Sequence, residues 1–332
     1  MVAVADPRRT APGWATARFD AGGARCDVEG YADLRARTPI DPSTRFRWFS
    51  VTKLVTAACV LRLVEAGRVG LDDDARRHLP WFDLDARVTV RHLLSHASGL
   101  ANPNALGWVH PPGRSIRAPA ALTRALWSRH RRLRAAPGAQ AHYSNLGYLV
   151  LGELVATHAG SFEDAARALL RDAGATTASF EPTPAARGHE ALVSPRAAVM
   201  AALFGRKTSS LVAYARGGWV GLTPFVIEGH AYGGLVGSIE DLAALGRALL
   251  EPGVILSRRS LDVMARPHAR GDDGETYGLA FYFHPVGWLG HGGAAGGYRA
   301  DLFLDPTRRR GVAILANAGD AAMGEVLLEL VR

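Results

Sequence analysis

The segment from Val51 to Ala66 limits the possible folds most strongly, because apolar residues at helical spacing occupy most of its surface. A helix of this kind belongs in the interior of a protein, where other elements cover it on several sides. Gly67 supplies a residue suited to ending it. Its first turn contains Lys53, one of only two lysines among 332 residues. An unpaired lysine at the start of a buried helix is costly, so we expect Lys53 to have a function.

Strand-like segments lie near both chain ends, and the sequence between them is rich in alanine and leucine at helical spacing. Alternating polar and apolar residues around Gly22-Gly23 predict an N-terminal β-hairpin. We expect an α/β (α+β) fold in which both chain ends form one antiparallel sheet, flanked by helices, with a mostly helical subdomain inserted. The expected strands are residues 14–19, 24–32, 278–284, 298–304 and 311–316; the expected helices are 51–66, 90–95, 146–158, 162–170, 238–250 and 321–331.

Composition and the chain start favour a cytoplasmic protein. Hydrophobic residues make up 48% and charged residues 21%, as in globular domains. No run of eighteen apolar residues predicts a membrane span, and the first residues lack the pattern of a secretory signal. Cys59 lies in the apolar helix and Cys26 in the hairpin, so they do not predict a disulfide framework.

The net charge of +8 comes almost entirely from arginine. The arginines are scattered, apart from short clusters at residues 129–134 and 308–310, and are typical of a solvated surface. No zinc, helix-turn-helix or RNA-binding signature accompanies them, so we do not predict a nucleic-acid partner. His92 and His96 have i, i+4 spacing, but no glutamate follows His92 as a metalloprotease helix requires, and we predict no metal site.

Ser50 and Lys53 form a Ser-x-x-Lys pattern at the start of the apolar helix. Residues three apart share a helix face, which brings the amine near the hydroxyl. The positive end of the helix dipole favours an alkoxide or oxyanion at Ser50. Burial lowers the pKa of a lysine, which allows it to accept a proton. The alternative, an N-cap serine beside a solvated lysine, fits the apolar surroundings less well.

Two further segments carry groups suited to acyl transfer. Tyr143 and Asn145, two apart in an extended loop, project to the same side, where a phenol can relay a proton and an amide can hold a carbonyl. The glycines of His291-Gly292-Gly293-Ala294 let a strand approach a ligand, and a backbone N–H there can complete an oxyanion hole. Each segment alone has a plainer interpretation, as a core tyrosine or as a glycine-rich loop with a surface histidine.

Together these segments resemble the serine β-lactamase and penicillin-binding-protein superfamily, in particular its class C β-lactamase and esterase branch. Five matches in the expected order cover nearly the whole chain, which is far less probable by chance than one motif. The resemblance makes residues 1–332 a single catalytic domain, with a sheet subdomain (1–60 and 225–332) and a helical subdomain (61–224). The matching segments are FRWFSVTKL, VRHLLSHASGL, PGAQAHYSNLGYLVLGEL, YGGLVGSIEDLAALGRALL and GHGGAAGGYRADLFLDPTRRRGVAILANAG.

By this resemblance, Ser50 is the acylated nucleophile, Lys53 accepts its proton and Tyr143 completes the acid/base pair. The backbone N–H groups of Ser50 and Ala294 form the oxyanion hole. No metal or organic cofactor is implied. The residues expected to bind substrate are Asn145, His291, Gly292 and Gly293.

His291 stands where most β-lactamases carry the lysine of a Lys-Thr-Gly triplet. Histidine is mostly neutral near pH 7, so it offers a cation only when protonated, while a neutral ring can donate one hydrogen bond to an ester carbonyl or an amide. Arg299 is another candidate cation whose direction the sequence leaves open. The triplet Lys207-Thr208-Ser209 lacks the flanking strand of the histidine segment. The chain also appears shortened after Leu170, and these departures disfavour recognition of a β-lactam carboxylate.

The sequence therefore predicts a serine hydrolase acting on a small-molecule ester or amide. Three alternatives stay open: an acyltransferase that uses an alcohol or amine instead of water, a β-lactamase or D-amino-acid-type peptidase, and a catalytically silent binding module. Without a signal peptide, a β-lactamase or D,D-peptidase would lie in the wrong compartment. We expect no membrane partner, and the sequence does not give the acyl group or the oligomeric state.

Overall fold

A nine-stranded antiparallel sheet forms the centre of the structure, and both chain ends contribute to it. The computed structural model describes residues 11–181, 186–192, 211–271, 274–284 and 287–319, together with 321 and 330. The strand order is β11-β12-β13-β14-β15-β16-β1-β2-β3. The strands are β1 (Gly13–Asp20), β2 (Gly23–Asp33), β3 (Thr38–Pro39), β11 (Ala269–Arg270), β12 (Thr276–Tyr277), β13 (Tyr282–Phe283), β14 (Leu289–Ala295), β15 (Tyr298–Asp305) and β16 (Arg310–Ala316).

The pairing of β1 with β16 joins the two chain ends. Their register runs from Trp14 opposite Ala316 to Asp20 opposite Arg310, which confirms the predicted sheet. The N-terminal hairpin is also confirmed, although β2 already begins at Gly23, directly opposite Asp20. Its turn is therefore one residue earlier than the Gly22-Gly23 expected from the sequence.

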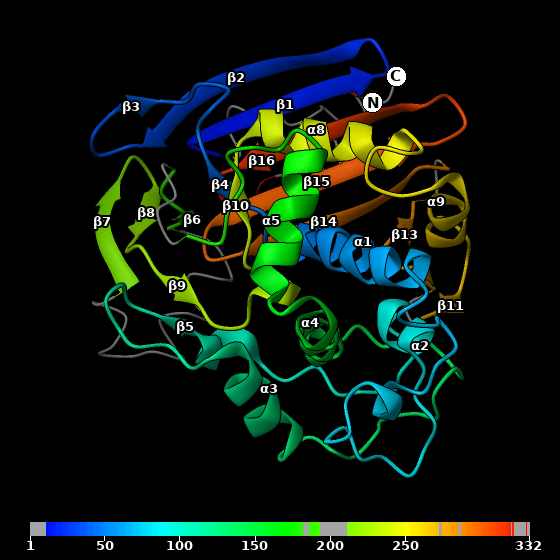
Figure 1. Ribbon diagram of the computed structural model, residues 1–332. Coiled ribbons are helices and arrows are strands. Elements are labelled where there is room, and N and C mark those ends of the chain that lie inside the picture. Colours follow the sequence, from blue (N-terminus) through cyan, green and yellow to red (C-terminus); the bar gives the residue numbers. More distant parts are fainter. Residues whose placement is uncertain are drawn as a thin grey trace.

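Helices cover one face of the sheet and extend below it (Figure 1). The helix α8 (Ile239–Leu250) lies against β1, β15 and β16, and Ser238 and Asp241 form its predicted capping box. Gly246 allows this close approach, because a Cβ there would lie 2.3 Å from the ring of Phe19. The other helices are α1 (Thr52–Glu65), α2 (Val90–Leu94), α3 (Pro119–Trp127), α4 (Asn145–Ala159), α5 (Phe162–Asp172) and α9 (Arg258–Met264).

The helix α1 is buried as its sequence predicts. All of its residues except Arg62, Val64 and Glu65 are buried. It packs against α4 and α5, which together shield it from solvent. Within the described residues, no helix combines the length and apolar character needed to cross a membrane.

The expected strand at residues 278–284 is wrong over its first half. Gly278 donates its N–H to the carbonyl of Phe281 at 2.9 Å, so the chain turns back between β12 and β13. Ala280 takes a positive φ of 68° in this turn, and its N–H donates to the carbonyl of Leu94 at 3.0 Å. The backbone there is satisfied by α2 instead of a neighbouring strand, which local alternation cannot reveal.

The middle of the chain is less helical than expected. It contains a three-stranded sheet of β6 (His189–Ala191), β8 (Trp219–Leu222) and β7 (Val212–Arg216), in that order. Short pairs also form between β5 (Val109–His110) and β9 (Val226–Ile227), and between β4 (Phe46–Arg47) and β10 (Val236–Gly237). The expected helix at 321–331 and the triplet at 207–209 lie outside the described residues, and the division into subdomains stays a prediction.

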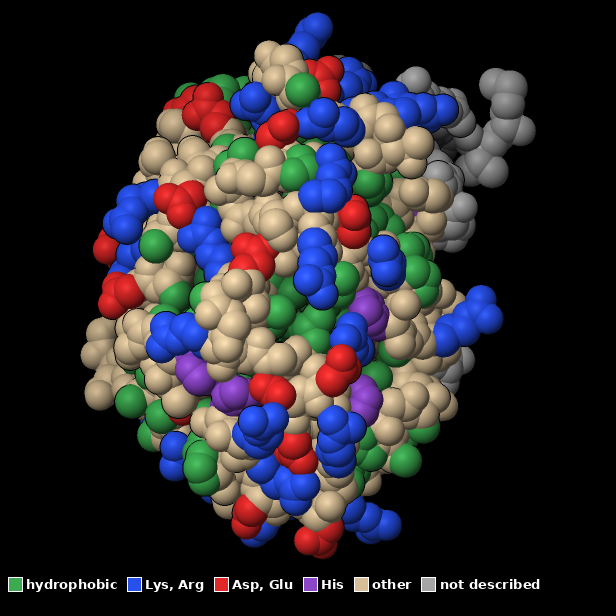
Figure 2. Space-filling model, turned by 45° about the vertical axis from the view of Figure 1, so that its right-hand side comes forward, with side chains coloured by type: hydrophobic (Ala, Val, Ile, Leu, Met, Phe, Trp, Pro, Cys, Tyr) green, Lys and Arg blue, Asp and Glu red, His purple; other side chains and the backbone are tan. Residues whose placement is uncertain are grey.

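Charged side chains are mixed on the surface. On the face shown in Figure 2, Lys and Arg side chains are dispersed among Asp and Glu side chains.

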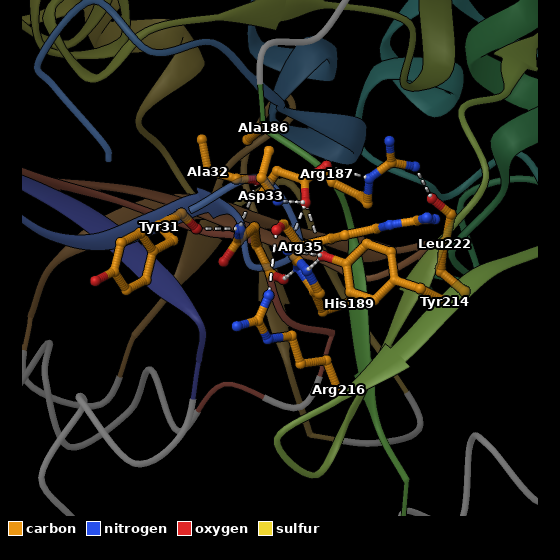
Figure 3. A network of polar contacts seen from close by, with 12 residues as sticks. Tyr31, Ala32, Asp33, Arg35, Ala186, Arg187, His189, Tyr214, Arg216 and Leu222 are labelled. Carbon is orange, nitrogen blue, oxygen red and sulfur yellow. Dashed lines mark hydrogen bonds and ion pairs between the residues drawn. The ribbon is translucent and has the colours of Figure 1, made fainter. Parts of the chain in front are cut away.

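A polar network centred on Asp33 fastens the three-stranded sheet to the end of β2 (Figure 3). The Asp33 carboxylate accepts hydrogen bonds from Arg187 Nε at 2.6 Å and from the Tyr214 hydroxyl at 3.0 Å. The Tyr214 oxygen also lies 2.8 Å from Nε2 of His189, which is buried. Burial alone would raise the pKa of Asp33, but the bonds from Arg187, Tyr214 and nearby backbone N–H groups lower it to about 2.

We predict that Asp33→Asn destabilises the protein by about 1–2 kcal/mol at pH 7, because it removes the charge that these donors stabilise. The folded-state pKa lies below the ordinary value of 3.8, so the contribution is present above that pH and is lost as the pH falls toward 2. Urea unfolding at pH 7 and pH 3 measures the difference. The exposed Asp27→Asn on the same strand is the control, with an expected change below about 0.5 kcal/mol. An equal effect of Asp33→Asn at both pH values would contradict the prediction.

Candidate active site

Ser50 lies in a single 3₁₀ turn, Phe49–Val51, immediately before α1. The predicted position at the helix N-terminus is thus correct to within one turn. Phe49 has a φ of +43°, an unfavourable conformation for a residue with a Cβ. Its ring packs near those of Phe225 and Tyr298, at centroid distances of 6.4 and 6.2 Å. This packing holds the strained backbone that presents Ser50, which is half-buried.

The amine of Lys53 is enclosed by oxygen atoms. Its Nζ lies 3.1 Å from Ser50 Oγ, 2.8 Å from Asn145 Oδ1 and 2.7 Å from the carbonyl oxygen of Tyr232. A neutral amine has two N–H groups and one lone pair. The amide and carbonyl oxygens accept the two N–H bonds, which leaves the lone pair for the hydroxyl of Ser50.

The surroundings of Lys53 favour this neutral form. The side chain is completely buried, and no carboxylate among the described residues forms an ion pair with it. Instead, the rings of Tyr143, Tyr148 and Tyr232 lie 4.8 to 5.7 Å from Nζ. Burial lowers the pKa of Lys53 well below its ordinary value of 10.5.

Tyr143 forms the second contact with Ser50. Its hydroxyl donates to Ser50 Oγ at 2.6 Å, and burial raises the pKa of the phenol above its usual value of 10.0. The residue lies just before α4, whose N-cap is Ser144. The structure therefore provides a continuous path of hydrogen bonds from Tyr143 through Ser50 to Lys53.

The strand β14 passes directly beside Ser50 because residue 293 is a glycine. A Cβ on Gly293 would lie 2.3 Å from the carbonyl oxygen of Trp48 and 2.8 Å from the backbone nitrogen of Ser50. Any other residue would push the strand away. Ala294, the predicted partner in the oxyanion hole, follows and is exposed to solvent.

His291 lies near Lys53 but offers no cation. The ring is completely buried, and its Nδ1 donates a hydrogen bond to the carbonyl of Gly292 at 2.7 Å. Burial, with a smaller contribution from Lys53 when it is protonated, lowers the pKa of His291 to about 3. Its Nε2 has no partner among the described residues. Because Nδ1 holds and uses the proton, Nε2 is an acceptor, and the expectation that the ring donates a hydrogen bond to substrate is wrong.

Arg299 cannot replace that cation. Its Nε and Nη2 donate to the carboxylate of Asp301 at 2.7 and 3.0 Å. A Cβ on Gly292 would point at Asp301, whereas one on Gly293 would point at Ser50. Adjacent residues of a strand face opposite sides, so Arg299 and Asp301 lie on the side of the sheet away from Ser50.

The two histidines with i, i+4 spacing do not share a helix face. The helix α2 ends at Leu94, and His92 is used in its N-terminal capping box with Thr89. His96 follows with a φ of +59° and lies with its ring 4.4 Å from that of Tyr143. Among the described residues, no three metal-binding side chains form a cluster.

Three contacts of the site were not predicted from the sequence. The Tyr232 carbonyl binds Lys53, the Tyr282 ring lies 4.4 Å from that of His291, and His96 contacts Tyr143. The glycines that follow Tyr232, Gly233 and Gly234, could have indicated its contact with Lys53, because glycines often mark a close approach of the backbone. His96 lies in the segment LLSHASGL, which resembles the family, but its spacing from His92 suggested only a zinc ligand.

Comparison with a protein-family model identifies the family of this chain. The model described as beta-lactamase matches residues 2–331. The chain belongs to the beta-lactamase family. Among curated members, esterase EstB from Burkholderia gladioli is 43% identical over 79 residues, which are 22% of this chain and 20% of EstB. The putative penicillin-binding protein PbpX from Bacillus subtilis (strain 168) is 25% identical over 268 residues, 79% of this chain and 60% of PbpX.

Solved structures share the fold across nearly the whole chain. The octameric penicillin-binding protein homologue from Pyrococcus abyssi aligns with a TM-score of 0.78 and 25% identity, covering 98% of this chain and 75% of that one. D-amino acid amidase from Ochrobactrum anthropi SV3 aligns with a TM-score of 0.80 and 24% identity, covering 98% and 95%. The family and its esterase relative support a serine hydrolase, while the curated alignments span about a fifth to three fifths of those relatives' own lengths.

We predict that His291 stays neutral from pH 5 to pH 8, with its proton on Nδ1, because its pKa is near 3. Heteronuclear NMR of the ¹⁵N-labelled imidazoles, assigned with His291→Asn, measures both the tautomer and the titration. A midpoint near the ordinary value of roughly 6.5 would show that the ring is solvated and able to carry charge.

Proposed function

We propose that this protein is a serine hydrolase that cleaves a neutral ester or small amide through an acyl-enzyme on Ser50. The observation that carries the proposal is the position of one hydroxyl between two groups that exchange protons. Ser50 Oγ lies 3.1 Å from Lys53 Nζ and 2.6 Å from the Tyr143 hydroxyl. Such an arrangement activates a serine that is otherwise a weak nucleophile.

In the proposed acylation step, Ser50 Oγ attacks the substrate carbonyl and its proton moves to the neutral amine of Lys53. The proton then passes through Tyr143 to the leaving alcohol or amine. In deacylation, water attacks the acyl carbonyl and its proton returns along the same path to Ser50 Oγ. This releases the acid and regenerates Ser50. A buried amine with a lowered pKa suits the role of base, because it is deprotonated nearer to neutral pH.

Backbone and amide groups complete the proposed site. The N–H groups of Ser50 and Ala294 stabilise the oxyanion, consistent with the close passage of β14 beside Ser50. Asn145 gives its Oδ1 to Lys53, which leaves its amide N–H groups for a substrate carbonyl. Gly293 lets β14 pass close to Ser50, which keeps that edge of the site narrow, while Gly292 contributes its backbone only.

The preference for an uncharged substrate follows from the missing cation. A lysine in place of His291 would offer a charge-assisted hydrogen bond to a carboxylate. Here the ring is neutral, and Arg299 is paired with Asp301 behind the sheet. Penicillins and cephalosporins carry such a carboxylate, so we expect them to be poorer substrates than neutral esters and amides.

The alternatives differ in what happens to the acyl group. An acyltransferase would give a new ester or amide when an alcohol or amine is added, at the expense of the free acid. A β-lactamase or D-amino-acid-type peptidase would prefer carboxylate-bearing substrates. A silent binding module would form no acyl-enzyme. Product analysis with and without added nucleophiles separates these outcomes.

We predict that a fluorophosphonate adds covalent mass to the peptide containing Ser50, because an activated serine attacks phosphorus as it attacks a carbonyl. Ser50→Ala should abolish the adduct, while replacement of the neighbouring buried hydroxyl by Thr52→Val should retain it. Intact-protein and peptide mass spectrometry measure the labelling. Undiminished labelling of Ser50→Ala would assign the nucleophile elsewhere.

We predict that Lys53→Ala and Tyr143→Phe each slow acylation by roughly two or more orders of magnitude. Groups that act as a unit are strongly non-additive, so the double variant should lose far less than the product of the single losses. Single-turnover kinetics with a chromogenic ester measure the rates. Strict additivity would mean that one of the two residues is a bystander.

We predict that His291→Lys shifts the ratio of kcat/KM toward carboxylate-bearing substrates by about 1–3 kcal/mol, the value of one charge-assisted hydrogen bond. The neutral variant His291→Asn is the matched control and should leave this ratio near that of the wild type. The wild-type ratio should also be constant from pH 5 to pH 8, because His291 does not titrate there. Wild-type hydrolysis of a cephalosporin in preference to every neutral ester at pH 8 would refute this substrate class.

A further inference from the structure

One residue, His96, fixes the chain on both sides of Tyr143. The N–H of His142 donates to the carbonyl oxygen of His96 at 2.8 Å. The N–H of Ser144 donates to the ring Nδ1 of His96 at 3.1 Å. The ring also lies against that of Tyr143, with centroids 4.4 Å apart and an interplanar angle of 33°. Backbone and side chain of Tyr143 are therefore both held by the same partner.

His96 is itself locked in an uncommon conformation. Its φ of +59° lies in the left-handed region, which residues other than Gly, Asn and Asp rarely adopt. The side chain is 1% exposed and packs against the rings of Tyr148 and Tyr277, at 5.0 and 5.5 Å. Since Nδ1 accepts a hydrogen bond from a backbone N–H, the ring proton must be on Nε2. The strain persists because these contacts determine the position completely.

We infer that His96 is a positioning residue that sets the phenol of Tyr143 at hydrogen-bond distance from Ser50. The inference rests on the proposed function, because His96 acts only through Tyr143. The two backbone hydrogen bonds fix where the Tyr143 Cα lies and account for most of the positioning, while the ring contact adds packing against the Tyr143 side chain. A displacement of about 1 Å at a reacting group lowers a rate by roughly a hundredfold.

Two substitutions separate the ring acceptor from the backbone conformation. Both Asn and Gly tolerate the positive φ of His96. Asn has an Oδ1 near the place of Nδ1 and can accept the N–H of Ser144, whereas Gly has neither acceptor nor ring. We expect H96N to acylate within about threefold of the wild type, and H96G to acylate roughly ten- to a hundredfold more slowly with little change in KM.

The measurement is the single-turnover acylation rate with a chromogenic ester, referred to the concentration of folded protein. Leu79→Ala is the control for lost stability, because Leu79 is a buried residue outside the site. It should lower the melting temperature and leave the acylation rate of the folded protein unchanged. H96G should slow acylation even at temperatures where it is fully folded.

A double substitution tests whether the effect passes through Tyr143. In the Tyr143→Phe background, H96G should change the acylation rate by less than about twofold, because the group that it positions is gone. Wild-type acylation by H96G, or a loss above tenfold in H96N, would overturn the role of His96 and leave the proposed function intact. Where H96G does not fold, a loss above tenfold in H96N still overturns the role of His96. Wild-type acylation by Tyr143→Phe would instead refute the proposed proton path, and the inference with it.

Discussion

The structure depends on how it accommodates one amine, that of Lys53, in its interior. A buried ammonium without a counter-ion is strongly unfavourable, and such a lysine gives up its proton more easily. The oxygens of Asn145 and Tyr232 satisfy the two N–H groups that a neutral amine retains. Asn145 begins α4 and Tyr232 lies in the segment before β10. The amine therefore connects these two segments to its own helix, α1. The same burial that makes Lys53 costly lowers its pKa, which suits it to the proposed role of base.

The groups around this amine are uncharged, and this gives the site its character. Burial raises the pKa of Tyr143 and lowers those of His96 and His291, so each stays neutral near pH 7. Arg299, the candidate cation expected from the sequence, faces the other side of the sheet. In the proposed mechanism, movement of a single proton between Ser50, Lys53 and Tyr143 is then the main electrostatic event, in largely buried surroundings that screen it weakly.

Local spacing was sufficient to predict the residues that lie one turn or one loop apart. Ser50 with Lys53, and Tyr143 with Asn145, follow from sequence neighbours, and the apolar pattern of α1 predicted its burial. The resemblance then brought these pairs together with β14. One contact that the sequence did not predict joins distant segments through the backbone, because the Tyr232 carbonyl lies 179 residues along the chain from Lys53. The other two are contacts between rings, Tyr282 with His291 and His96 with Tyr143.

The direction of the Arg299 side chain and the tautomer of His291 also could not be predicted from the sequence. The side of the sheet that Arg299 faces depends on the register of β14, and the tautomer of His291 depends on its bond to the next carbonyl. The turn at 278–281 replaced an expected strand because Gly278 bonds within the turn, and the N–H groups of Leu279 and Ala280 donate to the carbonyls of Met264 and Leu94 at helix ends. In the same way, the positive φ of His96 ended α2 and removed the helix face on which the zinc hypothesis depended.

The most direct test of the central claim is the pKa of Lys53 itself. The chain contains only two lysines, so NMR of protein labelled with ¹³C at lysine Cε gives two signals, and Lys207→Arg assigns them. We expect the Lys53 signal to titrate well below the ordinary value of 10.5. Titration of Lys53 at or above 10.5 would show that the amine is protonated at working pH, and would contradict its role as the base.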